Sequence, residues 1–387
     1  MRPISSFPTS PCLLSPYPLL VNCPISLLPR KRNLWPAGGG GLPFFLAGGP
    51  SKGMIRPEKL RPLEGKEKGR VAMELRSKYL GGMVGSALGD AIGQLAFHHR
   101  ERDGLLAAVE QAEQLLYTDD TAMAIGLAQS ILEKGGIDPQ HLGDTFSRNF
   151  YREPWRGYAA GPPAIFASVR LGGMSYVEAA RNLFGGAGSW GNGAAMRIVP
   201  VGLAYHGSGF LYQAAVASAE VTHAHPVGKD GAAALAWAIA EAVRLDPEHD
   251  FHAETFLQGL VAFARTEEIR QKLKQVGELI PARVPPQVAA SRLGQSVAVT
   301  ESLPFALYCF LLHPKSYPDC LLCAVTHGGD RDTLGAMAGA VSGAYLGKEA
   351  IPEAWQRKLE NRELIEYLAE SLFRWSSLDL DRRGGGV

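Results

Sequence analysis

Two short runs of the sequence gather acidic and hydroxyl side chains between apolar residues. The first run, at 116–121, reads Leu-Tyr-Thr-Asp-Asp-Thr, and the second, at 327–333, reads His-Gly-Gly-Asp-Arg-Asp-Thr. Carboxylates in an apolar setting are costly unless a hydrogen bond, a partner charge or a metal ion stabilises them. Four carboxylates from two such runs would form an oxygen-rich pocket, and oxygen ligands suit hard divalent cations. We therefore expect a two-metal hydrolytic site.

Each run also stands at the expected start of a helix, and this suggests a simpler interpretation. A Thr or Asp side chain at such a position can cap free backbone N–H groups and suits the helix dipole. Capping accounts for one polar residue of the first run, but not for Thr-Asp-Asp-Thr between apolar neighbours. The second run repeats the arrangement, and the two together favour metal ligation over capping.

A glycine-rich segment between these runs, residues 184–193, contains a formal GxGxxG match at Gly186, Gly188 and Gly191. The dinucleotide-binding fingerprint requires a preceding strand, but residues 176–183 have a helical pattern, which argues against a Rossmann domain. A glycine loop before a helix can still hold phosphate on its exposed N–H groups. Aromatic side chains in the loop could stack on a base or ribose. An ordinary glycine-rich connection remains the alternative.

Among ten histidines, His223 is the candidate site residue because it follows a helical run and stands shortly before Pro226. This pattern predicts a helix end, where a structural role and a role in the site are equally compatible. The pair His98-His99 lies in a polar run that favours a solvated surface turn. The sequence contains no P-loop, GxSxG or HExxH motif.

Two glycine stripes identify the elements that must position the acidic runs. Glycine recurs every fourth residue over 81–93 and again over 335–347. Residues at this spacing share one face of a helix, so a neighbouring backbone can approach closely. Glycine costs a helix about 1 kcal/mol relative to alanine, so eight such residues indicate that the close approach is needed. We predict two central helices, each delivering an aspartate near one end.

The remaining pattern is helical almost throughout, with Gly or Pro between segments. No alternating strand pattern stands out. Further helices are expected at about 119–134, 140–151, 175–183, 211–221, 228–244, 251–265, 301–313 and 350–375. These elements predict one compact all-α domain, a multi-helix bundle over about 74–378, followed by a frayed tail at 379–387.

Composition excludes several classes of partner. The chain has 387 residues, 46% hydrophobic and 20% charged, with a formal net charge of +1. Such values suit a soluble globular protein and give no indication of a nucleic-acid or membrane partner. The five cysteines lack disulfide spacing, and Cys320 and Cys323 stand in an apolar helical run that favours helix core over a zinc site. We expect a reducing, cytoplasmic setting, with the oligomeric state left open.

Residues 1–72 differ from the rest of the chain. Ten of the 26 prolines fall in the first 50 residues, and no acidic residue precedes Glu58. Prolines interrupt the apolar core that a secretory signal needs. A transit peptide is compatible with the missing acids, but a disordered extension is the simpler interpretation. Translation from Met54 or Met73 is a further alternative.

With these motifs in place, the sequence resembles the ADP-ribosylglycohydrolase family, all-α hydrolases that include dinitrogenase-reductase-activating glycohydrolase. The resemblance covers about residues 78–350. The motifs that carry it, in order, are Gly89-Asp90-Ala91-Ile92-Gly93, Tyr117-Thr118-Asp119-Asp120-Thr121, Gly188-Ser189-Trp190-Gly191-Asn192-Gly193, Thr222-His223 and Gly328-Gly329-Asp330-Arg331-Asp332-Thr333. An aromatic at Trp190 is typical of the branch that acts on serine-linked and poly(ADP-ribose).

The resemblance implies a Mg2+-dependent hydrolase that cleaves ADP-ribose from a protein side chain, poly(ADP-ribose) or a small conjugate. It implies two Mg2+ ions held by Thr118, Asp119, Asp120, Asp330, Asp332 and Thr333. It implies an ADP-ribose pocket lined by Phe184, Gly188, Ser189, Trp190, Gly191, Asn192 and His223. Asp119 and Asp332 are the expected catalytic carboxylates.

One position departs from the family pattern. The serine-directed branch has a catalytic glutamate seven residues after the aspartate of the Gly-Asp motif, and this chain has Phe97 there. Glu101 lies in the polar turn and does not simply replace it. The departure leaves open a catalytically weak or inactive ADP-ribose-binding homologue, and the oxygen ligands alone also permit a two-metal nucleotide phosphohydrolase.

Overall fold

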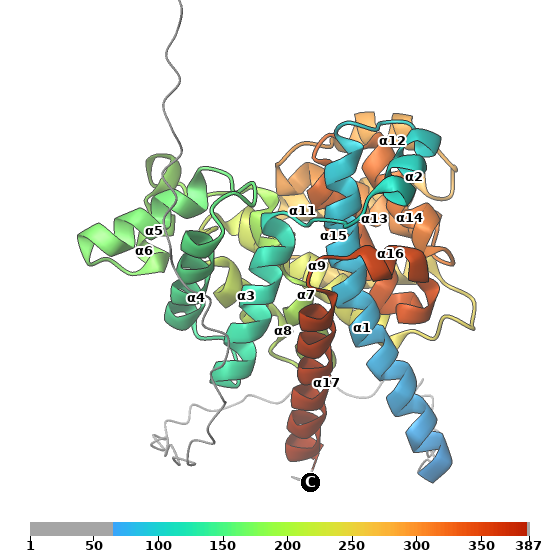
Figure 1. Cartoon of the computed structure of the whole chain (residues 1–387), viewed down its shortest axis with the longest axis horizontal. Helices are drawn as coiled ribbons and strands as arrows, with labels where there is room; N and C mark the ends of the chain where they lie inside the picture. Colours follow the sequence, from blue (N-terminus) through green and yellow to red (C-terminus); the bar gives the residue numbers. More distant parts are fainter. Residues whose placement is uncertain (1–64, 385–387) are drawn as a thin grey trace, which may run out of the picture. The chain divides into compact units, whose positions relative to one another are not determined.

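The computed structural model describes residues 65–384 of the chain, and these residues fold into an all-α domain (Figure 1). Seventeen α-helices and three short 3-10 turns make up its elements. Within this range only two isolated bridges, and no strand, are formed. The all-α prediction is therefore confirmed.

Two helices that are far apart in the sequence form the centre of the domain. These are α1 (Gly65–Ala96) and α15 (Arg331–Leu346), which lie side by side in Figure 1. A Cβ atom on Gly89 would overlap the carbonyl oxygen of Gly335, and one on Gly335 would overlap that of Gly89. The same reciprocal contact is made by the pairs Gly85–Gly339 and Gly81–Gly343. The predicted close approach of two glycine-striped helices is confirmed.

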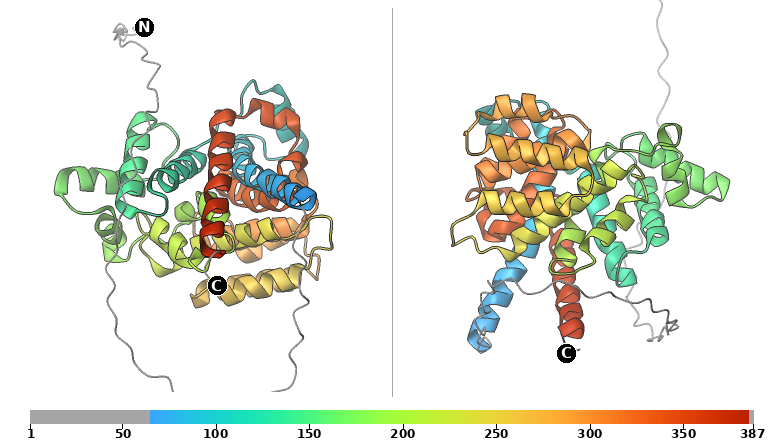
Figure 2. Two further views of the ribbon diagram at one scale, coloured as in Figure 1. Left: turned by 90° about the horizontal axis from the view of Figure 1, so that it is seen from below. Right: turned by 180° about the vertical axis from the view of Figure 1, so that it is seen from behind.

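The other helices surround this pair. The first half of the chain supplies α2 (Arg102–Gln111), α3 (Asp119–Lys134), α4 (Pro139–Arg152), α5 (Gly161–Gly172), α6 (Tyr176–Arg181), α7 (Val199–Ala204), α8 (Leu211–Ala219) and α9 (Pro226–Arg244). The second half supplies α10 (Ala253–Phe263), α11 (Glu267–Leu279), α12 (Pro286–Leu293), α13 (Val299–Leu312), α14 (Tyr317–His327), α16 (Glu353–Lys358) and α17 (Arg362–Gly384). Helices α4 to α6 lie on one side of the central pair and α12 to α14 on the other, as both views from front and back show (Figures 1 and 2).

Most expected helices are present, and the differences have local causes. The segment expected as one helix over 350–375 is divided into α16 and α17, because Asn361 takes a left-handed conformation with φ of 51°. Gly or Pro was expected between helices, but Pro162 and Pro163 stand in the first turn of α5, and Pro286 stands in the first turn of α12. Proline is tolerated there because those N–H groups have no helical partner.

The predicted extension at 1–72 lies outside the described residues except for its last part, where α1 begins at Gly65. Cys12 and Cys23 also fall outside. Cys309, Cys320 and Cys323 are buried and free, as expected for an apolar helical run. Of the described helices, none combines the length and apolarity of a membrane span.

Candidate active site

Asp90 organises the start of α3 from a different helix. Its buried carboxylate accepts hydrogen bonds from the backbone N–H groups of Thr118 and Thr121, both at 3.0 Å. The two threonine hydroxyls donate to the same carboxylate, at 2.7 Å from Thr118 and 2.6 Å from Thr121. Thr118 occupies the N-cap position of α3, but its side chain makes no capping bond. The cap of this helix is therefore Asp90, which sequence reasoning did not assign to the site.

The carboxylates of the first run project from the first turn of α3. Asp120 is only 2% exposed, and its Oδ1 has no hydrogen-bond partner. Its Oδ2 accepts a hydrogen bond of 3.2 Å from the hydroxyl of Thr118. Asp119 is half-buried beside it. A buried carboxylate oxygen without a donor is unusual and indicates a position that a ligand would satisfy.

The second run brings Asp330 and Asp332 to the start of α15. Asp330 is the N-cap residue of this helix, and its Oδ2 accepts a hydrogen bond of 2.6 Å from Asn192. Its backbone N–H donates to the carbonyl of Gln295 at 3.1 Å. A Cβ atom on Gly93 would overlap the Cα of Asp332. The backbone of Asp332 therefore packs directly against the last turns of α1.

The electrostatics show that the two runs meet. Burial raises the pKa of Asp119, and the negative charges of Asp90 and Asp332 raise that pKa further. Burial and the neighbouring Asp330 and Asp90 raise the pKa of Asp332 in the same way. The pKa of Asp120 is raised well above its ordinary value by the same causes, since burial and like charges both disfavour ionisation.

The donor set fits a hard cation in its chemistry. It consists of carboxylate and hydroxyl oxygens, the ligands that Mg2+ prefers. Arg197 lies near enough to affect Asp119, but it donates to the Gly193 carbonyl and the Thr222 hydroxyl instead. In the described part of the chain, no three His, Cys, Asp or Glu side chains stand ready to enclose a metal ion. Three observations therefore support a bound cation: the oxygen donors, the unpartnered Asp120 oxygen, and the closeness of several negative charges.

The glycine-rich segment lies beside the acidic runs through Asn192. Asn192 is buried and joins the segment to Asp330 by the hydrogen bond described above. Gly188 has a φ of 72° and packs against the backbone of His225 so closely that a Cβ atom would overlap it. Phe184 and Trp190 are 71% and 52% exposed, and the Trp190 ring lies 6.2 Å from that of His225. The segment ends in the three-residue 3-10 turn η2 (Asn192–Ala194) rather than an α-helix, so the expected helix-terminus phosphate site lacks its helix.

His223 is a buried neighbour of the same segment. Its Nδ1 shares a hydrogen bond of 2.8 Å with the Thr222 hydroxyl. A Cβ atom on Gly193 would overlap the imidazole, so the ring packs directly under the loop. Burial and the nearby Arg197 lower the pKa of His223 to about 3, and the ring is neutral. These contacts indicate that His223 supports the loop. The two other predicted pocket residues, Ser189 and Gly191, lie within the loop, where the Gly191 N–H donates to the Ser189 hydroxyl at 3.2 Å.

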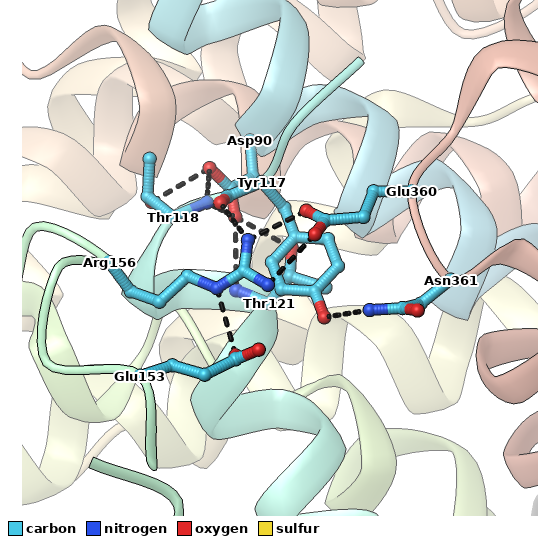
Figure 3. A network of polar contacts seen from close by, with 8 residues as sticks. All are labelled: Asp90, Tyr117, Thr118, Thr121, Glu153, Arg156, Glu360 and Asn361. Atoms are coloured by element: carbon cyan, nitrogen blue, oxygen red, sulfur yellow. Dashed lines mark hydrogen bonds and ion pairs between the residues drawn. The ribbon is translucent and has the colours of Figure 1, made fainter. Parts of the chain in front are cut away.

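A clamp that the sequence did not indicate holds the first acidic run in place (Figure 3). Arg156, in the α4–α5 connection, donates from Nη1 to the Tyr117 carbonyl at 3.1 Å. Its guanidinium forms a bidentate pair with Glu360 at 2.6 and 2.9 Å, donates to Glu153 at 2.9 Å, and lies 4.1 Å above the Tyr117 ring. Asn361 donates to the Tyr117 hydroxyl at 2.8 Å. The residue before Thr118 is thus fixed from two distant segments.

Phe97 occupies the sequence position where the family pattern expects an acid. It directly follows α1, which ends at Ala96, and is 37% exposed. Glu101 is exposed and lies just before α2, outside α1, so it does not take the position of the missing glutamate. Tyr158, in the α4–α5 connection, has its pKa raised by burial and by the charge of Asp119.

Comparison with known proteins identifies the family. Residues 72–379 match the family model described as ADP-ribosylglycohydrolase. The chain is 34% identical over 342 residues to the human ADP-ribosylhydrolase ARH3, covering 77% of this chain and 93% of that protein. It is 32% identical over 308 residues to an uncharacterized protein of Archaeoglobus fulgidus, covering 78% and 96%. A solved structure, an ADP-ribosylglycohydrolase-related protein complex, superposes with a TM-score of 0.56 at 26% identity, covering 79% and 99%. The chain belongs to the ADP-ribosylglycohydrolase family and is a hydrolase of glycosyl bonds.

Proposed function

We propose that this protein uses Mg2+ to hydrolyse the glycosidic bond between ADP-ribose and an acceptor, either a protein side chain, poly(ADP-ribose) or a small conjugate. The observation that carries the proposal is the meeting of two acidic runs, one from α3 and one from α15, around an unpartnered oxygen of Asp120. Sequence similarity to proteins named ADP-ribosylhydrolase supports the same substrate class.

The residues that would hold two Mg2+ ions are Thr118, Asp119, Asp120, Asp330, Asp332 and Thr333. Bound there, the metal would supply Lewis-acid polarisation and orient the ribose hydroxyls and a water. Asn192 donates to one oxygen of Asp330, and the side chains of Thr333 and Asp332 also hydrogen-bond to this carboxylate. Asp119 or Asp332 would accept the proton of the attacking water. The surrounding negative charge favours the oxocarbenium-like centre that develops at the anomeric carbon as the bond breaks.

The glycine segment would bind the rest of the substrate. Within the loop Gly188–Asn192, the backbone N–H groups of Ser189 and Trp190 would face the diphosphate. The N–H groups of Gly188, Gly191 and Asn192 already donate to the Leu183 carbonyl, the Ser189 hydroxyl and the Val297 carbonyl. The exposed rings of Phe184 and Trp190 would stack on the adenine or a ribose. The buried neutral His223 supports this loop from beneath and keeps its backbone in place.

A second function is favoured by one observation. Phe97 places an apolar ring where the serine-directed branch of the family keeps a glutamate. Without that acid the protein could bind ADP-ribose and turn over slowly or not at all. Product analysis on serine-linked, arginine-linked and poly(ADP-ribose) substrates separates the two functions. Release of ADP-ribose from any of them supports the hydrolase. Calorimetric binding of ADP-ribose with no release supports the binder, and phosphate release from ADP-ribose would indicate a phosphohydrolase instead.

A further inference from the structure

A second group of reactive side chains lies on the far side of α14 from the central glycine contact, outside the site described above. Cys323, on α14, forms side-chain hydrogen bonds with Cys309 of α13 and with two histidines, His313 and His327. These partners come from three places: the middle of α13, the residue that follows it, and the last turn of α14. A thiol surrounded by a second thiol and two imidazoles differs from an inert core cysteine.

The group opens to solvent through a cavity. Cys323 itself is only 5% exposed, but it lines a cavity of about 330 Å³ together with His313, His327 and Thr326. Arg100 and Arg102 border the cavity, as do the acidic Glu101 and Asp319. Arg102 is paired with Asp319 at 2.7 Å. The cavity therefore gives a small neutral reagent a route toward the Cys323 side chain.

The two thiols of the group differ in character. The hydrogen bond from Cys309 and those from the histidines lower the pKa of Cys323, against the effect of burial. Burial and the neighbouring Cys323 raise the pKa of Cys309 well above its ordinary value. Cys320, three residues before Cys323, faces the core, and its thiol donates to the Ala338 carbonyl at 3.8 Å. Since the thiolate is the nucleophile, Cys323 is the member of the group that reacts first.

Metal binding is the other chemistry that two Cys and two His could perform. All three hydrogen bonds run to Cys323 itself, and burial raises the pKa of Cys309, whereas a cysteine that ligates a metal must be a thiolate. Thiol oxidation is therefore the chemistry that the geometry favours.

We propose that Cys323 is a site of oxidation by small peroxides and that Cys309 resolves the product as a disulfide. In the first step the Cys323 thiolate attacks one oxygen of hydrogen peroxide. An S–O bond forms, the O–O bond breaks, and the released hydroxide takes a proton to leave as water. In the second step the Cys309 sulfur attacks Cys323, the S–S bond replaces the S–O bond, and a second water leaves with the Cys309 proton. Two thiols and one peroxide thus give one disulfide and two waters.

The test is peptide mapping of the full-length protein after exposure to a small excess of hydrogen peroxide. We expect a disulfide between the peptides of Cys309 and Cys323 in the wild type. In Cys309→Ser we expect a sulfenic acid on Cys323, captured by dimedone. Cys320→Ser is the matched control on the same helix and should still form the disulfide. Mapping reads each cysteine separately, so reaction at Cys12 or Cys23 does not interfere.

A kinetic measurement tests the role of the histidines. At pH 6, iodoacetamide should label Cys323 in the folded protein, and His313→Gln should slow that labelling by about tenfold as the thiolate fraction falls. Labelling of Cys323 only after urea is added would overturn the proposal. So would peroxide modification of Cys320 ahead of Cys323, or an unchanged labelling rate in the histidine variant.

Discussion

At the scale of single residues, Asp90 shows why part of the site escaped sequence reasoning. The acidic run at 118–120 and its start-of-helix position could be predicted, because composition and helical periodicity are local properties. The residue that caps helix α3 could not be predicted. An N-cap is usually the residue that precedes the helix, but here Asp90 does this from another helix, 28 residues before Thr118. The Gly89-Asp90 motif is visible in the sequence, but no local pattern indicates its hydrogen-bond partners.

Replacing Asp90 by Asn tests this cap. Four donors converge on the carboxylate, so the NH2 group of an amide would face donors and find no acceptor. We expect the free energy of unfolding to fall by about 2–4 kcal/mol, with loss of activity as Asp119 and Asp120 move. Urea denaturation measures the first effect. Asp103→Asn, on the exposed start of α2, is the control and should change stability by less than about 0.5 kcal/mol. Equal stability of the two variants would contradict the capping role.

His223 predicts a pH dependence of stability. Its pKa is lowered to about 3 in the folded protein, against about 6.5 in an unfolded chain. Between these values the unfolded chain binds a proton that the folded chain does not. The free energy of unfolding should therefore fall as the pH decreases below about 6.5, by up to about 1.4 kcal/mol per pH unit. Urea denaturation of His223→Asn should show a flatter curve between about pH 6 and about pH 4. Parallel curves for the two proteins would rule this out.

At the scale of elements, the glycine stripes were the most informative feature of the sequence. They predicted both central helices and their contact, since an i, i+4 stripe is needed only where backbones meet. Other elements were harder to predict. Helix α11 is not among the expected helices although its pattern is amphipathic, and α7, at six residues, is too short for periodicity to show. The division between α16 and α17 depends on the left-handed Asn361, which no repeat predicts.

Gly89→Ala tests the central contact. The new Cβ would overlap the Gly335 carbonyl, so α1 and α15 would have to separate along their length. We expect the free energy of unfolding to fall by about 3 kcal/mol or more. Gly104→Ala is a matched control in helix α2, where a Cβ meets nothing within 4 Å. It should leave stability unchanged or raise it by up to about 1 kcal/mol. Thermal melting of both variants measures these effects. A Gly89→Ala variant as stable as the wild type would contradict the close contact of α1 and α15.

The Arg156 clamp also acts between elements. Arg156→Ala removes the bidentate partner of Glu360 and the donor to the Tyr117 carbonyl. We expect a loss of about 2–4 kcal/mol in stability and a fall in kcat/KM at temperatures where the variant is still folded. Arg374→Ala removes an exposed i, i+4 pair and should cost less than about 1 kcal/mol. If the two arginine variants keep the same kcat/KM, the clamp does not position the acidic run.

At the scale of the whole molecule, the two acidic runs stand 211 positions apart when Asp119 and Asp330 are compared, yet they act on each other electrostatically. Their meeting follows from the glycine contact, which fixes α15 beside α1, and from Asp90, which fixes α3 to α1. The composition of the runs and the stripes predicted this meeting. The positions of the α4–α5 connection and of Glu360 around it depend on long-range packing and left no sequence signal.

Release of ADP-ribose from a modified protein is the measurement that decides whether these carboxylates hold Mg2+ for glycosidic hydrolysis. The wild type should release ADP-ribose with added Mg2+, stop when EDTA is added, and recover when Mg2+ is restored. The double variant Asp119→Ala with Asp330→Ala should fold and release none. Release by this variant at the wild-type rate, or undiminished release in EDTA, would contradict the account.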